Sequence, residues 1–161
     1  MKKKIYFIIS IFLLIIISSC SGYKPIFSST DLKIEIVDHS IKGNKKLGNK
    51  IYSQLYRVFK SGENNSNTKN VSIILEVSKD KKPTVKNSAG KILEYKIIVN
   101  SEIIINDFIT GEKILDQNFD SSLNYKVQNQ YSDTLNLENR SIENLVNNIY
   151  QKILLVLSQK I

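Results

Sequence analysis

The chain has 161 residues, with 23 lysines and arginines against 15 aspartates and glutamates, a formal net charge of +8. It holds one cysteine and one histidine, so neither an intramolecular disulfide nor a metal cluster held by several thiolates is possible. The basic residues follow neither a dense basic helix nor zinc-finger spacing, so a nucleic-acid partner is not indicated.

The first segment of the chain is typical of a lipoprotein signal peptide. Three lysines at positions 2–4 precede an apolar run over 5–17 that only Ser10 interrupts, and two serines then lead into Cys20. The run is shorter than the ~18 residues that a mature transmembrane helix needs. We therefore expect residues 1–19 to be removed and Cys20 to become the acylated first residue. The alternative is an uncleaved anchor.

The remaining 142 residues suffice for one domain that buries roughly two-thirds of its unfolded surface. We expect residues 20–31 to form a lipidated tether and residues 32–161 a single domain. The mature part keeps 20 basic residues against 15 acidic ones, a net charge near +5. This mild excess suits an anionic lipid or sugar-phosphate surface.

The first predicted elements of that domain are a strand, a helix and a second strand. Alternating apolar residues over 32–36 and 71–77 predict the strands. Between them, Asn44 is a favourable N-cap, the apolar residues at 47, 51, 55, 58 and 59 share one helical face, and Gly62 suits a helix C-cap. A polar loop is expected at 63–67, and a lysine-rich connection at 79–90.

A long hairpin and a helix are predicted for the second half of the chain. Apolar residues of one parity predict strands over 93–105 and 115–127, joined by a tight turn at Thr110-Gly111-Glu112. Apolar residues at three- and four-residue spacing over 142–157 then predict an amphipathic helix. Asp133 and Asn139 are both plausible caps for its start.

The element order β-α-β-β-β-α predicts an α+β fold, a two-layer sandwich in which two helices cover one face of a four-stranded, mostly antiparallel sheet. The opposite face is expected to be polar on most strands and partly apolar. Such a face is either wet or covered by a partner. Its apolar residues are Ile74, Ile92, Ile98, Ile104 and Ile114.

No enzyme is indicated by the titratable residues. The sole histidine, His39, lacks a nucleophile or metal-ligand spacing and is expected in a solvated loop. Paired acid and base chemistry is conceivable for Glu94 with Glu102, or Asp116 with Asp120, but a solvated sheet face is the simpler interpretation. We expect no metal site and no cofactor.

The start of the mature chain, residues 20–27 with the sequence CSGYKPIF, resembles the LptE family of lipopolysaccharide-assembly lipoproteins. Members, especially alphaproteobacterial ones, commonly begin with Cys-Gly-aromatic-x-Pro-aliphatic-aromatic, and here Ser21 is inserted after the cysteine. The helix start near Gly43, the Thr110-Gly111-Glu112 turn, the segment 122–125 and the Asn139-Arg140 pair are similar in order and spacing.

The resemblance implies an outer-membrane lipoprotein, on the periplasmic side, that plugs and helps assemble the LptD β-barrel translocon and contacts lipopolysaccharide. The alternative is a periplasm-facing auxiliary lipoprotein of an ABC-type lipid transporter. Because the implied ligand is anionic, five lysines between the second and third strands become candidate contacts, although a solvated loop or a barrel-lumen contact are alternatives. They are Lys79, Lys81, Lys82, Lys86 and Lys91.

Overall fold

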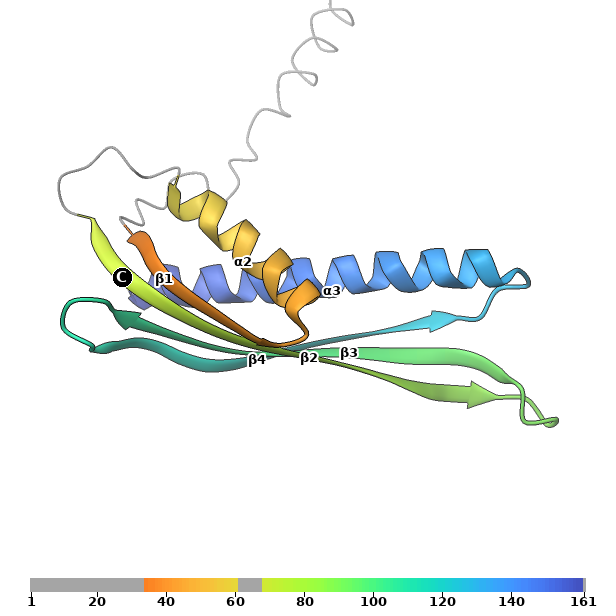
Figure 1. Cartoon of the computed structure of the whole chain (residues 1–161). Coiled ribbons are helices and arrows are strands. Elements are labelled where there is room, and N and C mark those ends of the chain that lie inside the picture. Colours follow the sequence, from red (N-terminus) through yellow and green to blue (C-terminus); the bar gives the residue numbers. More distant parts are fainter. Residues whose placement is uncertain (1–33, 61–67, 161) are drawn as a thin grey trace, which may run out of the picture. The chain divides into compact units, whose positions relative to one another are not determined.

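The computed structural model describes residues 34–60 and 68–160 (Figure 1). Its elements follow the predicted order β-α-β-β-β-α. The predicted signal peptide, Cys20, the tether, Gly62 and the loop at 63–67 lie outside the described residues. The elements are β1 (Ile34–Gly43), α2 (Lys45–Lys60), β2 (Lys69–Lys86), β3 (Ile92–Asp107), β4 (Lys113–Lys126) and α3 (Tyr131–Lys160).

The four strands form one sheet in the order β1-β2-β3-β4. β1 and β2 run parallel because α2 carries the chain back between them, whereas β2–β3 and β3–β4 are antiparallel pairs. Both helices cover the same face of this sheet (Figure 1). The predicted α+β two-layer sandwich is thus confirmed.

The core lies between the helices and one parity of strand residues. From α2 it takes the predicted face of Leu47, Ile51, Leu55 and Phe59, and from α3 a stripe of six residues. The opposite parity forms the open face, where the predicted isoleucines are half-buried. The strands contribute Ile34, Val71, Ile73, Leu75, Val77, Ile97, Val99, Ile103, Ile105, Leu115, Phe119 and Tyr125; α3 contributes Leu145, Val146, Ile149, Ile153, Leu154 and Leu157.

The turn from β1 into α2 depends on Gly43 and Asn44. Gly43 has a φ of 69°, in the left-handed region that favours glycine. The Asn44 side-chain oxygen accepts a hydrogen bond from the Leu47 N–H at 3.2 Å, so the predicted N-cap is confirmed. The Asn44 N–H in turn donates to the Val77 carbonyl at 2.6 Å, which fixes the helix start against β2.

The predicted connection at 79–90 is wrong over most of its length. β2 continues to Lys86 and pairs with β3, which leaves only Asn87–Gly90 for the turn. This part of β2 is exposed, so no apolar alternation is needed and the sequence resembles a loop. Pro83 is tolerated there because the β2–β3 register shifts between Pro83 and Val85.

Two other boundaries also differ from the prediction. β1 runs to Gly43 because a register shift between Ile36 and Asp38 interrupts the alternation without ending the strand. α3 begins at Tyr131, so neither Asp133 nor Asn139 precedes it as a cap. The Thr134 hydroxyl, in the first turn, instead accepts the Gln128 N–H at 2.9 Å.

The sheet has two ends with different composition. At the proximal end lie the starts of β1 and β2, the β3–β4 turn and the last turn of α2. At the distal end lie the β2–β3 turn, the end of β4 and the start of α3 (Figure 1). Within the described ranges, neither helix combines the length and the apolar character needed to cross a bilayer.

Candidate functional site

The five candidate lysines do not form one cluster. Lys79 and Lys81 lie on the helix-covered side of β2, where both approach Glu138 of α3. Lys82 lies on the open face, opposite Lys96 of β3. The remaining two, Lys86 and Lys91, flank the β2–β3 turn at the distal end.

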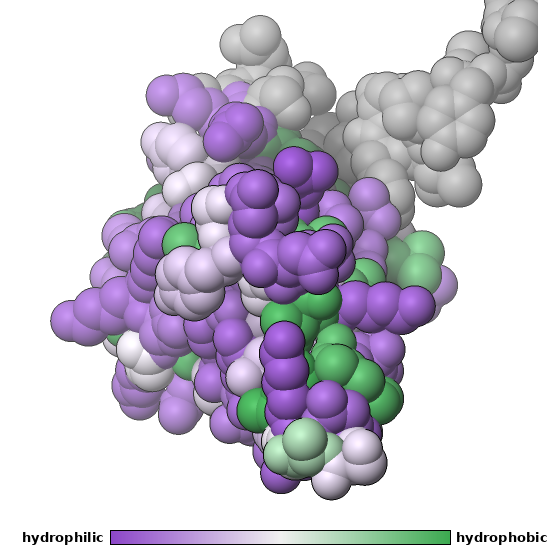
Figure 2. All heavy atoms as spheres, turned by 90° about the vertical axis from the view of Figure 1, so that its right-hand side faces the viewer, coloured by the Kyte–Doolittle hydropathy of each residue, from purple (hydrophilic) through white to green (hydrophobic). Residues whose placement is uncertain are grey.

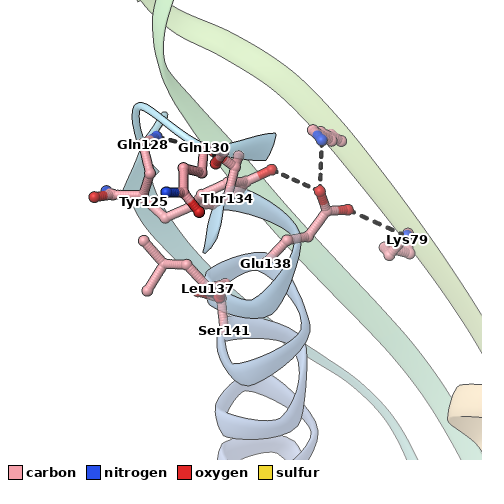
Figure 3. Close-up of polar contacts among 9 residues, drawn as sticks. Lys79, Tyr125, Gln128, Gln130, Thr134, Leu137, Glu138 and Ser141 are labelled. Atoms are coloured by element: carbon pink, nitrogen blue, oxygen red, sulfur yellow. Dashed lines mark hydrogen bonds and ion pairs between the residues drawn. The ribbon is translucent and has the colours of Figure 1, made fainter. Parts of the chain in front are cut away.

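Glu138 is the centre of the polar contacts at the distal end (Figure 3). One of its carboxylate oxygens accepts hydrogen bonds from the Lys81 ammonium at 2.6 Å and from the Tyr125 hydroxyl at 2.8 Å. The other oxygen lies 4.0 Å from the Lys79 ammonium. These contacts tie the start of α3 to β2 and β4.

Two tyrosine rings complete this arrangement. Tyr95 and Tyr125 are neighbours across β3 and β4, with ring centroids 5.8 Å apart. The Lys81 ammonium lies 4.2 Å from the Tyr95 centroid, within the range of a cation–π contact. The Lys81 ammonium is therefore held by a carboxylate and by two aromatic rings.

The contacts favour the charged forms of both partners. Burial opposes ionisation of Glu138, but hydrogen bonds from Lys81 and Tyr125 lower the pKa of its carboxyl. Burial likewise disfavours the Lys81 ammonium, and hydrogen bonds with Glu138 and Tyr125 raise the pKa of Lys81. One carboxylate thus faces two ammonium groups, which leaves the distal end with an excess of positive charge.

A groove of about 460 Å³ adjoins this cluster between the sheet and the start of α3. Apolar and aromatic side chains line much of it, and Lys81 and Lys91 lie at its margin. Figure 2 shows the same end of the molecule, which is largely hydrophilic and has a hydrophobic patch between hydrophilic side chains. The apolar and aromatic lining residues are Ile92, Tyr95, Val127, Tyr131 and Leu135.

Lys82 and Lys96 form a second positive feature, on the open face. They are direct cross-strand neighbours, and like charges in that position destabilise a sheet. Among the described residues, no carboxylate lies within ion-pair distance of either ammonium. A bound anion would relieve this repulsion.

The carboxylates considered for acid–base chemistry are separated along their strands. Glu94 and Glu102 are eight residues apart on β3, and Asp116 and Asp120 are four apart on β4, which corresponds to about 26 and 13 Å. His39 lies on β1, not in the expected loop, and stacks on Tyr52 with centroids 4.1 Å apart. The described residues contain no group of side chains suited to a metal ion.

Comparison with descriptions of protein families, and with curated protein sequences, gave no match. Solved structures of lipoproteins do match in fold. Rare lipoprotein B from Shewanella oneidensis is 13% identical, with a TM-score of 0.53 over 76% of this chain and 94% of that one. An uncharacterised lipoprotein B from Nitrosomonas europaea is 14% identical, with a TM-score of 0.55 over 76% and 83%.

A minor lipoprotein from Acinetobacter baumannii is 16% identical, with a TM-score of 0.51 over 80% of this chain and 92% of that one. The chain has the fold of these lipoproteins. The overlap spans most of each compared chain, so the likeness covers the whole sandwich and not one hairpin.

Sequence reasoning missed Glu138 and Tyr125, which contact each other beside Lys81, and it missed Lys96, which lies opposite Lys82 on the open face. Glu138 lies 57 positions from Lys81 in the sequence, and the local pattern around neither residue predicts their contact. Only the β2–β3 register places Lys96 opposite Lys82. The lysine-rich composition of 79–91 was the one available signal.

Replacing Glu138 with glutamine is expected to lower the free energy of unfolding by about 1–2 kcal/mol at neutral pH, because it leaves Lys81 without its carboxylate. The pKa of Glu138 is lower in the folded state than in the unfolded chain. Its contribution to the free energy of unfolding is therefore complete above the unfolded-state pKa, and it is lost as the pH falls through the folded-state pKa. Urea unfolding should show the stabilities of the two proteins converging as the pH falls below the ordinary pKa range of a glutamate carboxyl.

Glu143→Gln is the matched control for that substitution. Glu143 pairs with Lys50 but is half exposed, so we expect a loss below about 0.5 kcal/mol. An equal difference between the parent and Glu138→Gln at neutral and acid pH would mean that the loss comes from replacing an acceptor oxygen with an amide NH2 group, and not from removing the negative charge.

Proposed function

We propose that the protein is an outer-membrane lipoprotein of the LptE family, anchored through acylated Cys20, that plugs and helps assemble the β-barrel translocon LptD. The observation that carries this proposal is the fold shared with rare lipoprotein B and the other lipoproteins over most of their lengths. The segment 20–27 adds the resemblance to alphaproteobacterial members.

The surface of the sandwich suits a barrel lumen. Such lumens are polar, whereas barrels carry their apolar band on the outside. Polar residues occupy the middle of the open face, and half-buried isoleucines such as Ile74, Ile98 and Ile104 lie among them. A face of this mixed character can pack against a lumen wall without exposing a large apolar surface.

The distal end supports a contact with lipopolysaccharide. This ligand combines phosphate and acidic sugar groups with apolar chains, and the distal end combines lysines with an apolar groove. Lys79 and Lys81 are partly neutralised by Glu138, so we assign the main phosphate contacts to Lys82, Lys86 and Lys91. Lys96, opposite Lys82, would take part in the same contact.

Changing Lys82, Lys86 and Lys91 together to glutamine should weaken lipopolysaccharide binding by roughly three- to thirty-fold at low salt, since each exposed charge pair contributes modestly. The difference from the parent should shrink as salt rises and screens the charges. Binding of the purified protein across a salt titration measures both effects.

The control for that variant changes Lys45, Lys46 and Arg57 of α2 to glutamine, which removes the same charge from exposed positions of another element. We expect this control to bind almost like the parent. Equal weakening of binding in both variants would mean that net charge alone causes the effect. Unchanged binding in the variant of Lys82, Lys86 and Lys91 would contradict the proposed lysine contacts.

Membrane separation distinguishes the proposal from the ABC-transporter alternative. The protein should sediment with outer membranes, and intact mass should show acyl chains on Cys20. Accumulation in the inner membrane would favour the alternative, and an unmodified Cys20 thiol on the membrane-extracted protein would contradict the anchor.

A further inference from the structure

The proximal end presents an apolar pair on a well-ordered turn. Phe108 and Ile109, in the β3–β4 turn, are 51% and 80% exposed. Large side chains this exposed are better explained by a partner or a membrane when they lie together on a loop tip.

Hydrogen bonds hold the backbone of this turn in one shape. The Asp107 carboxylate accepts the N–H groups of Ile109 and Thr110, each at 2.9 Å, and these bonds lower the pKa of Asp107. The Phe108 N–H donates to the Asn70 carbonyl of β2 at 2.8 Å. Gly111 closes the turn at a φ of 73°. The apolar pair is therefore held outward by the turn.

The described residues give this end no excess of positive charge, with three lysines against four carboxylates. Lys60, Lys69 and Lys113 lie around the turn and the start of β1, and the acidic residues of the same end are Glu35, Asp107, Glu112 and Asp116. Lys113 is paired with Asp116 at 2.6 Å. Apolar contact, and not net charge, is what this surface offers to a partner.

The position of Cys20 indicates which partner is near. Ile34, where β1 begins, is at the proximal end and lies 14 residues after Cys20 in the sequence. Fourteen residues span at most about 50 Å, so an anchored Cys20 limits how far the proximal end can move from the bilayer. Tethering raises the effective concentration of lipid at this end, so even a weak apolar contact becomes populated.

We propose that the β3–β4 turn inserts Phe108 and Ile109 into the interfacial region of the membrane that anchors Cys20. The proximal end then rests on the bilayer, and the lysines of the distal end point away from it. This inference rests on the proposed acylation of Cys20 and adds a second, reversible membrane contact within the folded domain.

A fluorescence experiment tests this contact directly, because the chain contains no tryptophan. The acylated protein carrying Phe108→Trp is reconstituted in phosphatidylcholine vesicles whose acyl chains are brominated. We expect blue-shifted emission and strong quenching. The matched control is Tyr131→Trp, at the 81% exposed start of α3 on the distal end, for which we expect neither effect.

Two further arms make the test specific. Adding Ile109→Asp to Phe108→Trp should reduce the quenching, whereas adding phosphatidylglycerol or salt should change it little, because the contact is apolar. If Phe108→Trp shows the same emission maximum and the same quenching as Tyr131→Trp in these vesicles, the turn does not enter the membrane and the proposal is overturned. A protein partner would then be the better explanation for the exposed turn.

Intact mass of the same sample separates this failure from failure of the proposed function. If Cys20 is acylated but the tryptophan is not quenched, the proposed contact of the turn with the membrane is rejected, and the proposed lipid anchor is not. An unmodified Cys20 thiol rejects the anchor, and the turn contact with it.

Discussion

Ile149→Ala and Ile153→Ala are each expected to lower the free energy of unfolding by about 2–5 kcal/mol, the largest effects anticipated for single substitutions in this chain. Both side chains are completely buried, and they lie one helical turn apart on the face of α3 that packs against the sheet. Alanine at either position leaves a cavity that the sheet and α2 close only in part.

Urea unfolding of the purified variants measures this loss. Leu155→Ala is the matched control from the same helix, because Leu155 is 48% exposed and its truncation should cost less than about 1 kcal/mol. If both isoleucine variants unfold like the parent, α3 does not pack on the sheet as described, and an intermolecular role for this helix becomes the better explanation.

Gly43→Ala is expected to cost about 2–4 kcal/mol, for a reason of backbone geometry. Gly43 has a positive φ, which strains any residue with a Cβ atom, and a Cβ placed there would overlap the Val77 carbonyl oxygen. That oxygen belongs to the backbone and already accepts the Asn44 N–H, so it has no room to move. The substitution therefore disturbs the junction of β1, α2 and β2.

Gly90→Ala separates the two causes of that loss, the strain of the positive φ and the overlap with the Val77 carbonyl. Gly90 also has a positive φ, of 79°, but a Cβ there would meet no atom within 4 Å. We expect Gly90→Ala to lose only the left-handed strain, about 1–2 kcal/mol. Equal losses at both glycines, measured by the same urea titration, would mean that contact with Val77 contributes nothing.

The fold was predictable wherever one side of an element is buried. Residues 71–77 and 97–105 alternate because every second side chain enters the core, and α2 and α3 show their buried faces at helical spacing. Asn44 marked the start of α2 for a chemical reason, since its side chain satisfies a free backbone N–H. These signals are local, so the sequence carries them directly.

Prediction failed where the chain leaves the core. The second half of β2 is exposed, so burial imposes no pattern and its lysines resemble a loop. The start of α3 was misplaced because Gln130, the residue before the helix, is not a typical N-cap residue. The partners of Lys81 and Lys82 could not be predicted either, because they depend on strand register and on helix position across many residues.

The distal and proximal ends of the sheet differ in the side chains that they expose. Lysines and an apolar groove occupy the end far from Ile34, and the apolar turn occupies the end next to it. From Lys69 to Lys81 β2 extends by twelve residues, or about 40 Å. If the proximal end rests on the membrane as proposed, the lysines that we assign to phosphate contacts lie well away from that membrane.

Affinity purification of the tagged, acylated protein from solubilised outer membranes tests the proposed partnership most directly. We expect an LptD β-barrel to co-purify with the parent protein. Cys20→Ala should reduce the amount of protein at the membrane more than it weakens the complex that does form, because the folded domain makes the contact. Recovery of an inner-membrane transporter component in place of the barrel, or of no barrel at all, would contradict the proposed function.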